Sequence, residues 1–314
     1  MAVHVNVDNF RAAETARMCD GFVQMAGGVN AWAHFRAPTP VEHQPVIRMN
    51  RDTLYSIAVV DLSEGATVSL PDAGDRYVSA MVVNAEHYIN QVLHAPGPHE
   101  LTVATHGSRF VAVAVRIFTD PNDPADVAAV NTLQDQLVIE AGAAGPYEHP
   151  DFDETSLTAT HDALLALGAG LQGSGRMFGT TDHVEPTRHL IGTALGWGGL
   201  PESEAIYFIE GEPKSAGRYT LALQDVPTDA FWSVSVYNRD GYFEPNEFGT
   251  YSLNSVTATP EADGSVVVSF APDGAGLANH LYVMDGWNYA LRLYRPRPEV
   301  VGGTWSPPKA QPIA

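Results

Sequence analysis

The sequence predicts a mainly β fold with a helical insertion, built as two antiparallel β-sandwich or jelly-roll-like units. Many short strand-like runs are separated by Pro, Gly and Asp turns, and no regular alternation of strand and helix indicates a parallel sheet. Helical periodicity is confined to the N-terminus and the middle of the chain. We therefore expect an N-terminal helix and first β unit over 1–120, a helical connection over 121–200, and a C-terminal β unit over 201–314.

The first unit should begin with a helix that follows the capping pair Asp8-Asn9 and stops at Gly27-Gly28. Extended chain is expected over 46–62, with a polar interruption at 50–52. The remaining strands, each bounded by turn residues, are predicted at 66–70, 76–84, 101–105 and 110–118.

The connection should hold helices over 126–140 and 153–171, the second capped by Asp153, and a third that starts at Pro186. Asp263-Gly264 predicts a hairpin between the strands on either side of it. The strands of the last unit are predicted at 219–223, 231–238, 251–259, 265–270 and 289–294.

The chain is strongly acidic, with 37 Asp and Glu against 17 Lys and Arg and a net charge of −20. Such a field repels nucleic acid and anionic lipid, so we expect neither a nucleic-acid nor a membrane partner. The single cysteine, Cys19, excludes an intrachain disulfide and a thiolate metal cluster. We see no leader pattern and no long apolar run, so a cytoplasmic protein is the default, and a homo-oligomer is compatible with the sequence.

Several common enzyme motifs are missing from the sequence. We find no G-x-S-x-G, no G-x-x-x-x-G-K-[ST] and no H-E-x-x-H, and the glycine run from Gly168 follows a predicted helix instead of a strand. We therefore expect no bound cofactor, which leaves acid–base chemistry by side chains.

Polar side chains crowd residues 48–55, a stretch too polar for an ordinary core strand. Asp52 is the candidate base and Tyr55 the candidate acid or oxyanion donor, with Asn50 and Arg51 in contact with substrate. The competing interpretation is a buried Arg–Asp pair that fixes a strand crossing.

A second cluster lies around His87, whose ordinary pKa near neutrality makes it the candidate proton-transfer residue. Tyr88 and Asn90 are candidate substrate contacts. His94 and His99 follow, but the histidine spacing matches no defined metal site, so we predict no metal ligand and keep a metal near these histidines as the alternative.

A third cluster starts at Tyr237, a candidate acid, where a strand meets a turn. Aromatic rings with amides and a carboxylate at a strand end are typical of a site for a sugar or a small polar-aromatic ligand. The alternative is a hairpin whose tyrosines cover the core edge. The candidate substrate contacts here are Asn238, Asp240 and Tyr242.

Two sequence segments resemble known families. Val46–Ser56, with Leu70–Tyr77 after it, resembles the family catalogued as domain of unknown function 1254. The C-terminal half resembles its usual companion, domain of unknown function 1214, and the two resemblances span about residues 30 to 310. They imply two β-rich units joined by helices and no established activity. The C-terminal resemblance lies in Phe231–Asn238, Asp240–Tyr242, Leu291–Tyr294 and Gly303–Trp305.

From these clusters we expect a cofactor-independent enzyme of hydrolase, lyase or isomerase type, acting on a small organic molecule in a cleft between the two β units. Asp52 or His87 would be the base, and Tyr55 or Tyr237 the acid. The alternatives are a non-catalytic sugar or metabolite binding protein that uses the same cleft, and a structural oligomerisation module.

Overall fold

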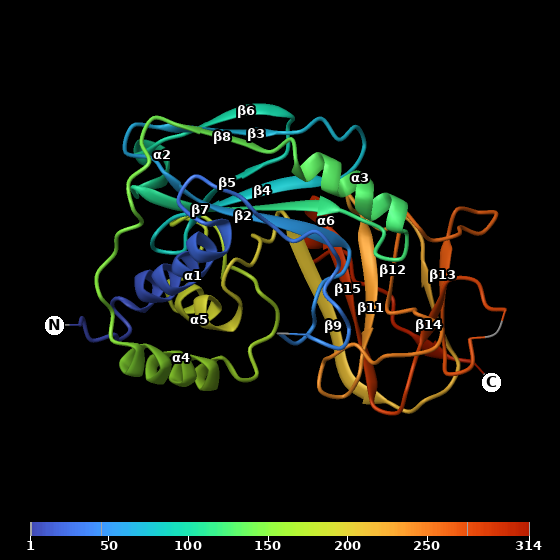
Figure 1. The fold of residues 1–314 in the computed structure, drawn as a ribbon. Coiled ribbons are helices and arrows are strands. Elements are labelled where there is room, and N and C mark those ends of the chain that lie inside the picture. Colours follow the sequence, from blue (N-terminus) through green and yellow to red (C-terminus); the bar gives the residue numbers. More distant parts are fainter. Residues whose placement is uncertain (1, 45, 275, 314) are drawn as a thin grey trace. The chain divides into compact units, whose positions relative to one another are not determined.

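A computed structural model describes residues 2–44, 46–274 and 276–313. The chain is mainly β (Figure 1), as predicted. Contacts divide it into two compact units. Unit 1 comprises Met1–Arg36, Leu54–Phe118 and Ala128–Glu202, and unit 2 comprises Ala37–Thr53, Thr119–Val127 and Ser203–Ala314.

Unit 1 holds a five-stranded sheet of order β1-β2-β7-β4-β5 and a three-stranded sheet of order β6-β3-β8, and their paired strands run antiparallel. Every residue of β4 and β7 is buried, which explains why these strands read as almost continuous apolar runs. The strands are β1 (Ala33–His34), β2 (Thr53–Asp61), β3 (Ala66–Leu70), β4 (Val78–Val83), β5 (Ile89–Leu93), β6 (Gly97–Leu101), β7 (Phe110–Phe118) and β8 (Val138–Ala141).

The helices lie mainly in unit 1. α1 ends at Gly27, whose left-handed backbone lets its N–H reach the Val23 carbonyl. Asp153 caps α4 as predicted, because its carboxylate accepts the Ser156 N–H. Among the described helices, none combines the length and the apolar character that a membrane crossing requires. The helices are α1 (Phe10–Ala26), α2 (Val103–His106), α3 (Pro124–Gln134), α4 (Glu154–Gly168), α5 (Pro186–Gly196) and α6 (Pro298–Val301).

Unit 2 contains two four-stranded sheets, of order β14-β13-β10-β16 and β12-β11-β15-β9. Their apolar faces share one core that includes Trp232, Val268, Phe270 and Leu291. One pair, β13 with β14, is parallel. The strands are β9 (Ala205–Lys214), β10 (Tyr219–Leu223), β11 (Trp232–Tyr237), β12 (Ser252–Asn254), β13 (Val266–Ala271), β14 (His280–Tyr282), β15 (Trp287–Tyr294) and β16 (Gln311–Pro312).

Three local predictions were wrong. The expected strand 101–105 is the end of β6 followed by α2, which Thr102 caps by accepting the Thr105 N–H. The expected helix 126–140 ends at Gln134, and residues 138–141 form β8 against β3. Asp263-Gly264 joins no hairpin, since β12 pairs with β11 and β13 pairs with β10. In the last two cases the local pattern could not reveal a pairing partner far away in the sequence.

The extended stretch predicted over 46–62 is also shorter than expected, because only Thr53–Asp61 forms a strand. The residues before it belong to unit 2. We call residues 37–44 and 46–53 the strap. The Arg48 N–H donates to the Gly241 carbonyl at 2.7 Å, and the Gln44 side chain bonds both backbone groups of Phe243. The strap is therefore fixed to the turn that follows β11.

Candidate functional site

The sheet β12-β11-β15-β9 of unit 2 has one apolar and one polar face. Trp232, Val234 and Val236 of β11 face the core, so the alternate residues of the strand point to the opposite side. The strand register places four of these opposite-side residues in one row across the sheet. This polar row consists of Asn254, Ser233, Arg292 and Tyr207.

Arg292 is the buried cation of this face, with 5% of its surface exposed. One guanidinium nitrogen donates to the Ser235 hydroxyl at 2.9 Å, and the other donates to the Tyr237 hydroxyl at 2.5 Å and the Arg48 carbonyl at 2.8 Å. The Tyr237 hydroxyl in turn donates to the Met49 carbonyl at 2.9 Å. Arg292 and Tyr237 thus tie the strap to the sheet through two of its carbonyl groups.

Asp52, at the end of the strap, is fully buried, and neither of its carboxyl oxygens has a hydrogen-bond partner among the described residues. The Ser233 hydroxyl is likewise buried and unpartnered. Burial raises the pKa of Asp52, and this effect outweighs the opposing influence of Ser233, Arg292 and Asn254, whose groups lie near the carboxyl without meeting hydrogen-bond geometry. A raised pKa favours the neutral, protonated carboxyl.

The residues next to Asp52 hold its backbone in place. Its N–H donates to the Asn50 side chain at 2.8 Å, and its carbonyl accepts the Thr119 N–H at 2.9 Å. Arg51 donates to the Thr39 carbonyl at 2.5 Å, while its Nε has no partner. Asn50 and Arg51 were predicted to contact substrate, and here they shape the turn that presents Asp52.

The third predicted cluster forms a tight turn after β11. The Asn238 side-chain oxygen Oδ1 accepts the N–H groups of Asp240 and Tyr242 at 3.1 and 3.0 Å, and the Asn238 backbone N–H donates to the Tyr242 carbonyl at 2.7 Å. Gly241 occupies a left-handed conformation with φ of 89° next to Ile47 of the strap. These residues therefore define how the turn meets the strap.

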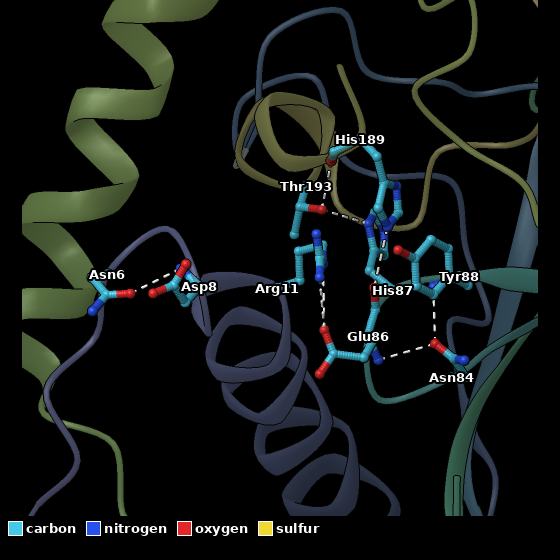
Figure 2. Close-up of polar contacts among 9 residues, drawn as sticks. All are labelled: Asn6, Asp8, Arg11, Asn84, Glu86, His87, Tyr88, His189 and Thr193. Carbon is cyan, nitrogen blue, oxygen red and sulfur yellow. Dashed lines mark hydrogen bonds and ion pairs between the residues drawn. The ribbon is translucent and has the colours of Figure 1, made fainter. Parts of the chain in front are cut away.

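The second predicted cluster lies in unit 1, and Figure 2 shows the contact between the His87 ring and the Thr193 hydroxyl. His87 is fully buried, and its Nε2 accepts the Gly198 N–H at 2.9 Å. Its Nδ1 must then carry the proton and donate to the Thr193 hydroxyl at 2.9 Å, which itself donates to the His189 carbonyl at 2.9 Å. Burial first, and the charges of His189 and Arg11 next, hold the pKa of His87 well below its usual range. His87 is therefore neutral and bonded on both sides.

His87 belongs to a stack of four rings. His189 lies between Tyr88 and His87, with ring centroids 4.5 and 5.5 Å apart, and Trp197 covers the other face of His87 at 5.4 Å. Arg11 of α1 lies over the Tyr88 ring at 5.8 Å and pairs with Glu86 at 3.3 Å, as the ion pair drawn in Figure 2 shows. The stack joins α1, α5 and the turn after β4, which is a packing role.

The remaining predicted residues of unit 1 have local partners. Asn90 donates to the Thr105 carbonyl at 2.8 Å. His94 and His99 contact the carbonyls of Val78 and Ala95, and the described residues contain no group of three His, Cys, Asp or Glu side chains placed to hold a metal ion.

Tyr55 lies on β2, where its ring faces the Arg116 guanidinium at 5.3 Å and its carbonyl accepts the Gln134 amide at 2.9 Å. The structure thus groups Asn50, Arg51, Asp52 and Tyr237 within unit 2, and Tyr55, His87, Tyr88 and Asn90 within unit 1. A single pocket shared by His87 and Asp52 stays a prediction.

All four members of the polar row were missed as site candidates. Ser233 and Asn254 lie on strands that the sequence did predict, and Ser233, Ser235 and Tyr237 alternate with apolar residues along β11. Polar residues at every second position of a strand whose other positions are apolar are a readable signal for a polar second face. The alternation does not indicate which segment packs on that polar face, and the structure shows that it is the strap.

Comparisons with known proteins give families and a fold. Residues 29–107 match the family model "Protein of unknown function (DUF1254)", and residues 210–298 match "Protein of unknown function (DUF1214)". The crystal structure of the VPA0106 protein from Vibrio parahaemolyticus superposes with a TM-score of 0.74 at 17% identity, over 99% of this chain and 100% of that chain.

The crystal structure of a putative uncharacterized protein from Burkholderia cenocepacia matches with a TM-score of 0.55 at 16% identity, over 98% of this chain and 88% of that one. No curated protein matches. At these identities the two structures show the fold alone. The family resemblance stated from the sequence is confirmed, and the chain carries a DUF1254 region followed by a DUF1214 region.

Proposed function

We propose that the protein is a cofactor-independent enzyme that carries out acid–base chemistry on a small organic molecule at the Asp52 cluster, defined as Asp52, Ser233, Asn254 and Arg292. One observation supports the proposal most. Asp52 is a fully buried carboxyl group, and no described residue hydrogen-bonds to either of its oxygens. Leaving such a group unpaired costs roughly 1–3 kcal/mol, and folded proteins retain few of them. A perturbed carboxyl of this kind is typical of functional sites.

The location of the cluster also supports a functional role. Asp52 lies in the segment that matches DUF1254, whereas Ser233, Asn254 and Arg292 lie in the segment that matches DUF1214. Both matched regions therefore contribute side chains to one cluster inside unit 2.

The chemistry of the cluster favours proton transfer at an oxygen atom. A neutral Asp52 can donate its proton to a carbonyl or leaving-group oxygen and take one back afterwards. The unpartnered Ser233 hydroxyl and the Arg292 charge can stabilise negative charge on that oxygen. The Arg292 charge favours a substrate that carries a carboxylate or a carbonyl group. Hydrolysis, elimination and isomerisation of such molecules all fit this arrangement.

The proposal gives no proton-transfer role to His87 or Tyr237. Both ring nitrogens of His87 are bonded, and the Tyr237 hydroxyl already accepts from Arg292 and donates to Met49. Tyr237 is a positioning residue for Arg292. Asp52 is then the one group of its cluster that is assigned a proton-transfer role, and no second acid or base accompanies it. A non-catalytic metabolite-binding protein is therefore the second candidate function.

Turnover measurements separate the two functions. Wild-type protein and Asp52→Asn are incubated with small carboxylate esters, hydroxy acids and keto acids, and the mixtures are followed by proton NMR. We expect wild-type turnover of at least one compound and a loss of roughly 100-fold or more in Asp52→Asn, the usual contribution of an acid–base group. The exposed Asp75→Asn is the matched control and should behave as wild type.

Equal turnover by Asp52→Asn and wild type would remove Asp52 from the chemistry. Saturable binding of a compound without turnover would favour the metabolite-binding function. Infrared difference spectra of wild type against Asp52→Asn at pH 7 test the premise without a substrate, because a neutral Asp52 gives the carbonyl band of a protonated carboxylic acid.

A further inference from the structure

Unit 1 contains a cavity of about 220 Å³ that is unrelated to the Asp52 cluster, since all of its lining residues lie in unit 1. It is bounded by α1, by the end of β4, by the start of β7 and by the segment 147–152. Apolar side chains form most of its walls, among them Ala12, Ala16, Val83, Phe110 and Phe152.

Asn84 and Ser108, two uncharged polar residues of the wall, already have hydrogen-bond partners. The Asn84 side chain accepts the N–H groups of Glu86 and Tyr88 and donates to the His106 carbonyl. The Ser108 hydroxyl accepts the Ala85 N–H at 3.2 Å and donates to the Phe110 carbonyl at 3.0 Å. A charged or sugar-like guest would lose its hydration without gaining equivalent hydrogen bonds here.

Arg109 and His149, the two residues of the wall that can carry positive charge, are committed as well. The His149 ring contacts the Asp20 carboxylate at 2.9 Å and the Pro150 carbonyl at 2.8 Å. The Arg109 guanidinium makes two hydrogen bonds to Asp61 and one to Glu148, whose side chain is largely exposed. An anionic guest would have to compete with two carboxylates for this guanidinium, so the cavity does not favour an anion.

Two neutral groups, Cys19 and Tyr147, give the cavity weak hydrogen-bonding capacity. The two side chains lie side by side, and Cys19 is 2% exposed. Burial raises the pKa of the Cys19 thiol to about 12 and also raises the pKa of Tyr147, so neither carries charge at neutral pH.

We propose that this cavity binds a small, uncharged, mostly apolar molecule with one six-membered ring and at most one hydroxyl group. Its size sets the class of ligand. A dry apolar cavity of about 150 Å³ in another protein holds benzene, so 220 Å³ accommodates a substituted ring of roughly 8–12 non-hydrogen atoms. The committed polar groups exclude sugars and carboxylates, and Cys19 and Tyr147 allow one weak polar contact.

Calorimetric titration with 4-methylphenol tests the proposal. We expect a Kd on the order of 0.1–1 mM for wild type, in line with the affinity that a ligand of this size reaches. The anion 4-methylbenzoate, of similar shape, should not bind. Ala12→Leu should weaken the binding of 4-methylphenol by at least roughly tenfold, because the larger side chain occupies the cavity. Ala26→Leu, the same change on α1 away from the cavity, is the matched control.

The single cysteine provides a second readout that needs no variant. Saturating 4-methylphenol should slow modification of Cys19 by a small methanethiosulfonate reagent at alkaline pH at least roughly threefold, since the occupied cavity screens the thiol. The proposal is overturned if 4-methylphenol neither binds wild type nor protects Cys19. It is also overturned if 4-methylbenzoate binds as tightly, or if Ala12→Leu folds and binds as wild type does.

Discussion

Two aspartates, one directly before strand β2 and one at its last position, are both fully buried, yet they differ in the hydrogen-bond donors around their carboxyl groups. Asp61, the last residue of β2, accepts two hydrogen bonds from the Arg109 guanidinium at 3.2 and 3.0 Å. It also accepts the backbone N–H groups of Ser63 and Gly145 at 3.0 and 3.1 Å. Asp52, directly before β2, has no hydrogen-bond partner on either carboxyl oxygen in the part of the chain that the structure describes. Burial alone therefore does not distinguish these two residues.

The number of donors does distinguish them. The hydrogen bonds from Arg109, followed by those from Ser63 and Gly145, hold the pKa of Asp61 well below its usual range. Burial raises the pKa of Asp52, because its effect outweighs the opposing influence of Ser233, Arg292 and Asn254, none of which makes a hydrogen bond of good geometry to the carboxyl. A buried carboxylate surrounded by donors is an anchor of the fold. One without donors is left free to exchange a proton, which is why we place the proposed chemistry at Asp52.

The largest effect is expected for Asp61→Asn. The amide cannot accept on both sides, so the N–H groups of Ser63 or Gly145 and the Arg109 donors lose partners in a buried place. Lost hydrogen bonds to a charged acceptor cost about 2–4 kcal/mol of unfolding free energy. Urea denaturation at pH 7 measures this loss. A loss no larger than that of the exposed Asp75→Asn would show that the donors around Asp61 do not stabilise unit 1.

Tyr237→Phe should have the next largest effect, about 1–2 kcal/mol, because it removes one acceptor of Arg292 and one donor to the strap. The same variant also tests the difference between the surroundings of Asp52 and Asp61. An Arg292 N–H freed from Tyr237 can turn toward Asp52, which would make the surroundings of Asp52 more like those of Asp61. The infrared band of the protonated Asp52 carboxyl should weaken in this variant.

An unchanged infrared band together with the expected loss of stability would mean that Tyr237 holds the strap without influencing Asp52. Phe243→Leu is a suitable control, since Phe243 packs against the Tyr237 ring at 4.8 Å and makes no hydrogen bond to Arg292 through its side chain.

The sequence could predict part of this picture. Strands β3, β7 and β10 form over the predicted residues, since each is an apolar run closed by turn residues. Asp52 was a candidate because it lies in an unusually polar stretch. Asp61 was not singled out, since it follows Val59-Val60 in an apolar run and two of its three donor residues, Arg109 and Gly145, lie 48 and 84 residues away. Side-chain partners at such separations are set by tertiary contacts, which local patterns do not encode.

The same reasoning explains what was missed at the candidate sites. The sequence predicts extended chain over 46–62 with a polar interruption at 50–52, but the strand begins only at Thr53, and the residues before it form a strap that is hydrogen-bonded to Arg292 and Gly241. His87 drew attention as a titratable loop residue. Its bonds to Thr193 and Gly198 come from residues more than 100 positions away, and they turn it into part of a packed ring stack.

Asp52→Asn should have the smallest effect at pH 7, under about 1 kcal/mol, because an amide replaces a neutral carboxyl of nearly equal shape. The pH dependence carries the stronger test. A folded-state pKa above the unfolded value of about 3.9 means that the folded protein binds more protons, so the stability from Asp52 is complete below about pH 3.9. It is lost as the pH rises through the folded-state pKa. Asp61 must show the reverse, because its lowered pKa gives stability that is present above about pH 3.9 and lost as the pH falls.

The unfolding free energy of wild type minus that of each Asn variant should therefore behave differently for the two aspartates over pH 4–7, with the Asp61 difference nearly level above about pH 5 and falling only toward lower pH. The stability advantage of wild type over Asp52→Asn should decrease as the pH rises, whereas its stability advantage over Asp61→Asn should not. Two curves of the same slope would mean that Asp52 is ionised in the folded protein and has donors after all. In that case the competing interpretation made from the sequence, a buried Arg–Asp pair that fixes the chain, would describe Asp52 better than an acid–base role.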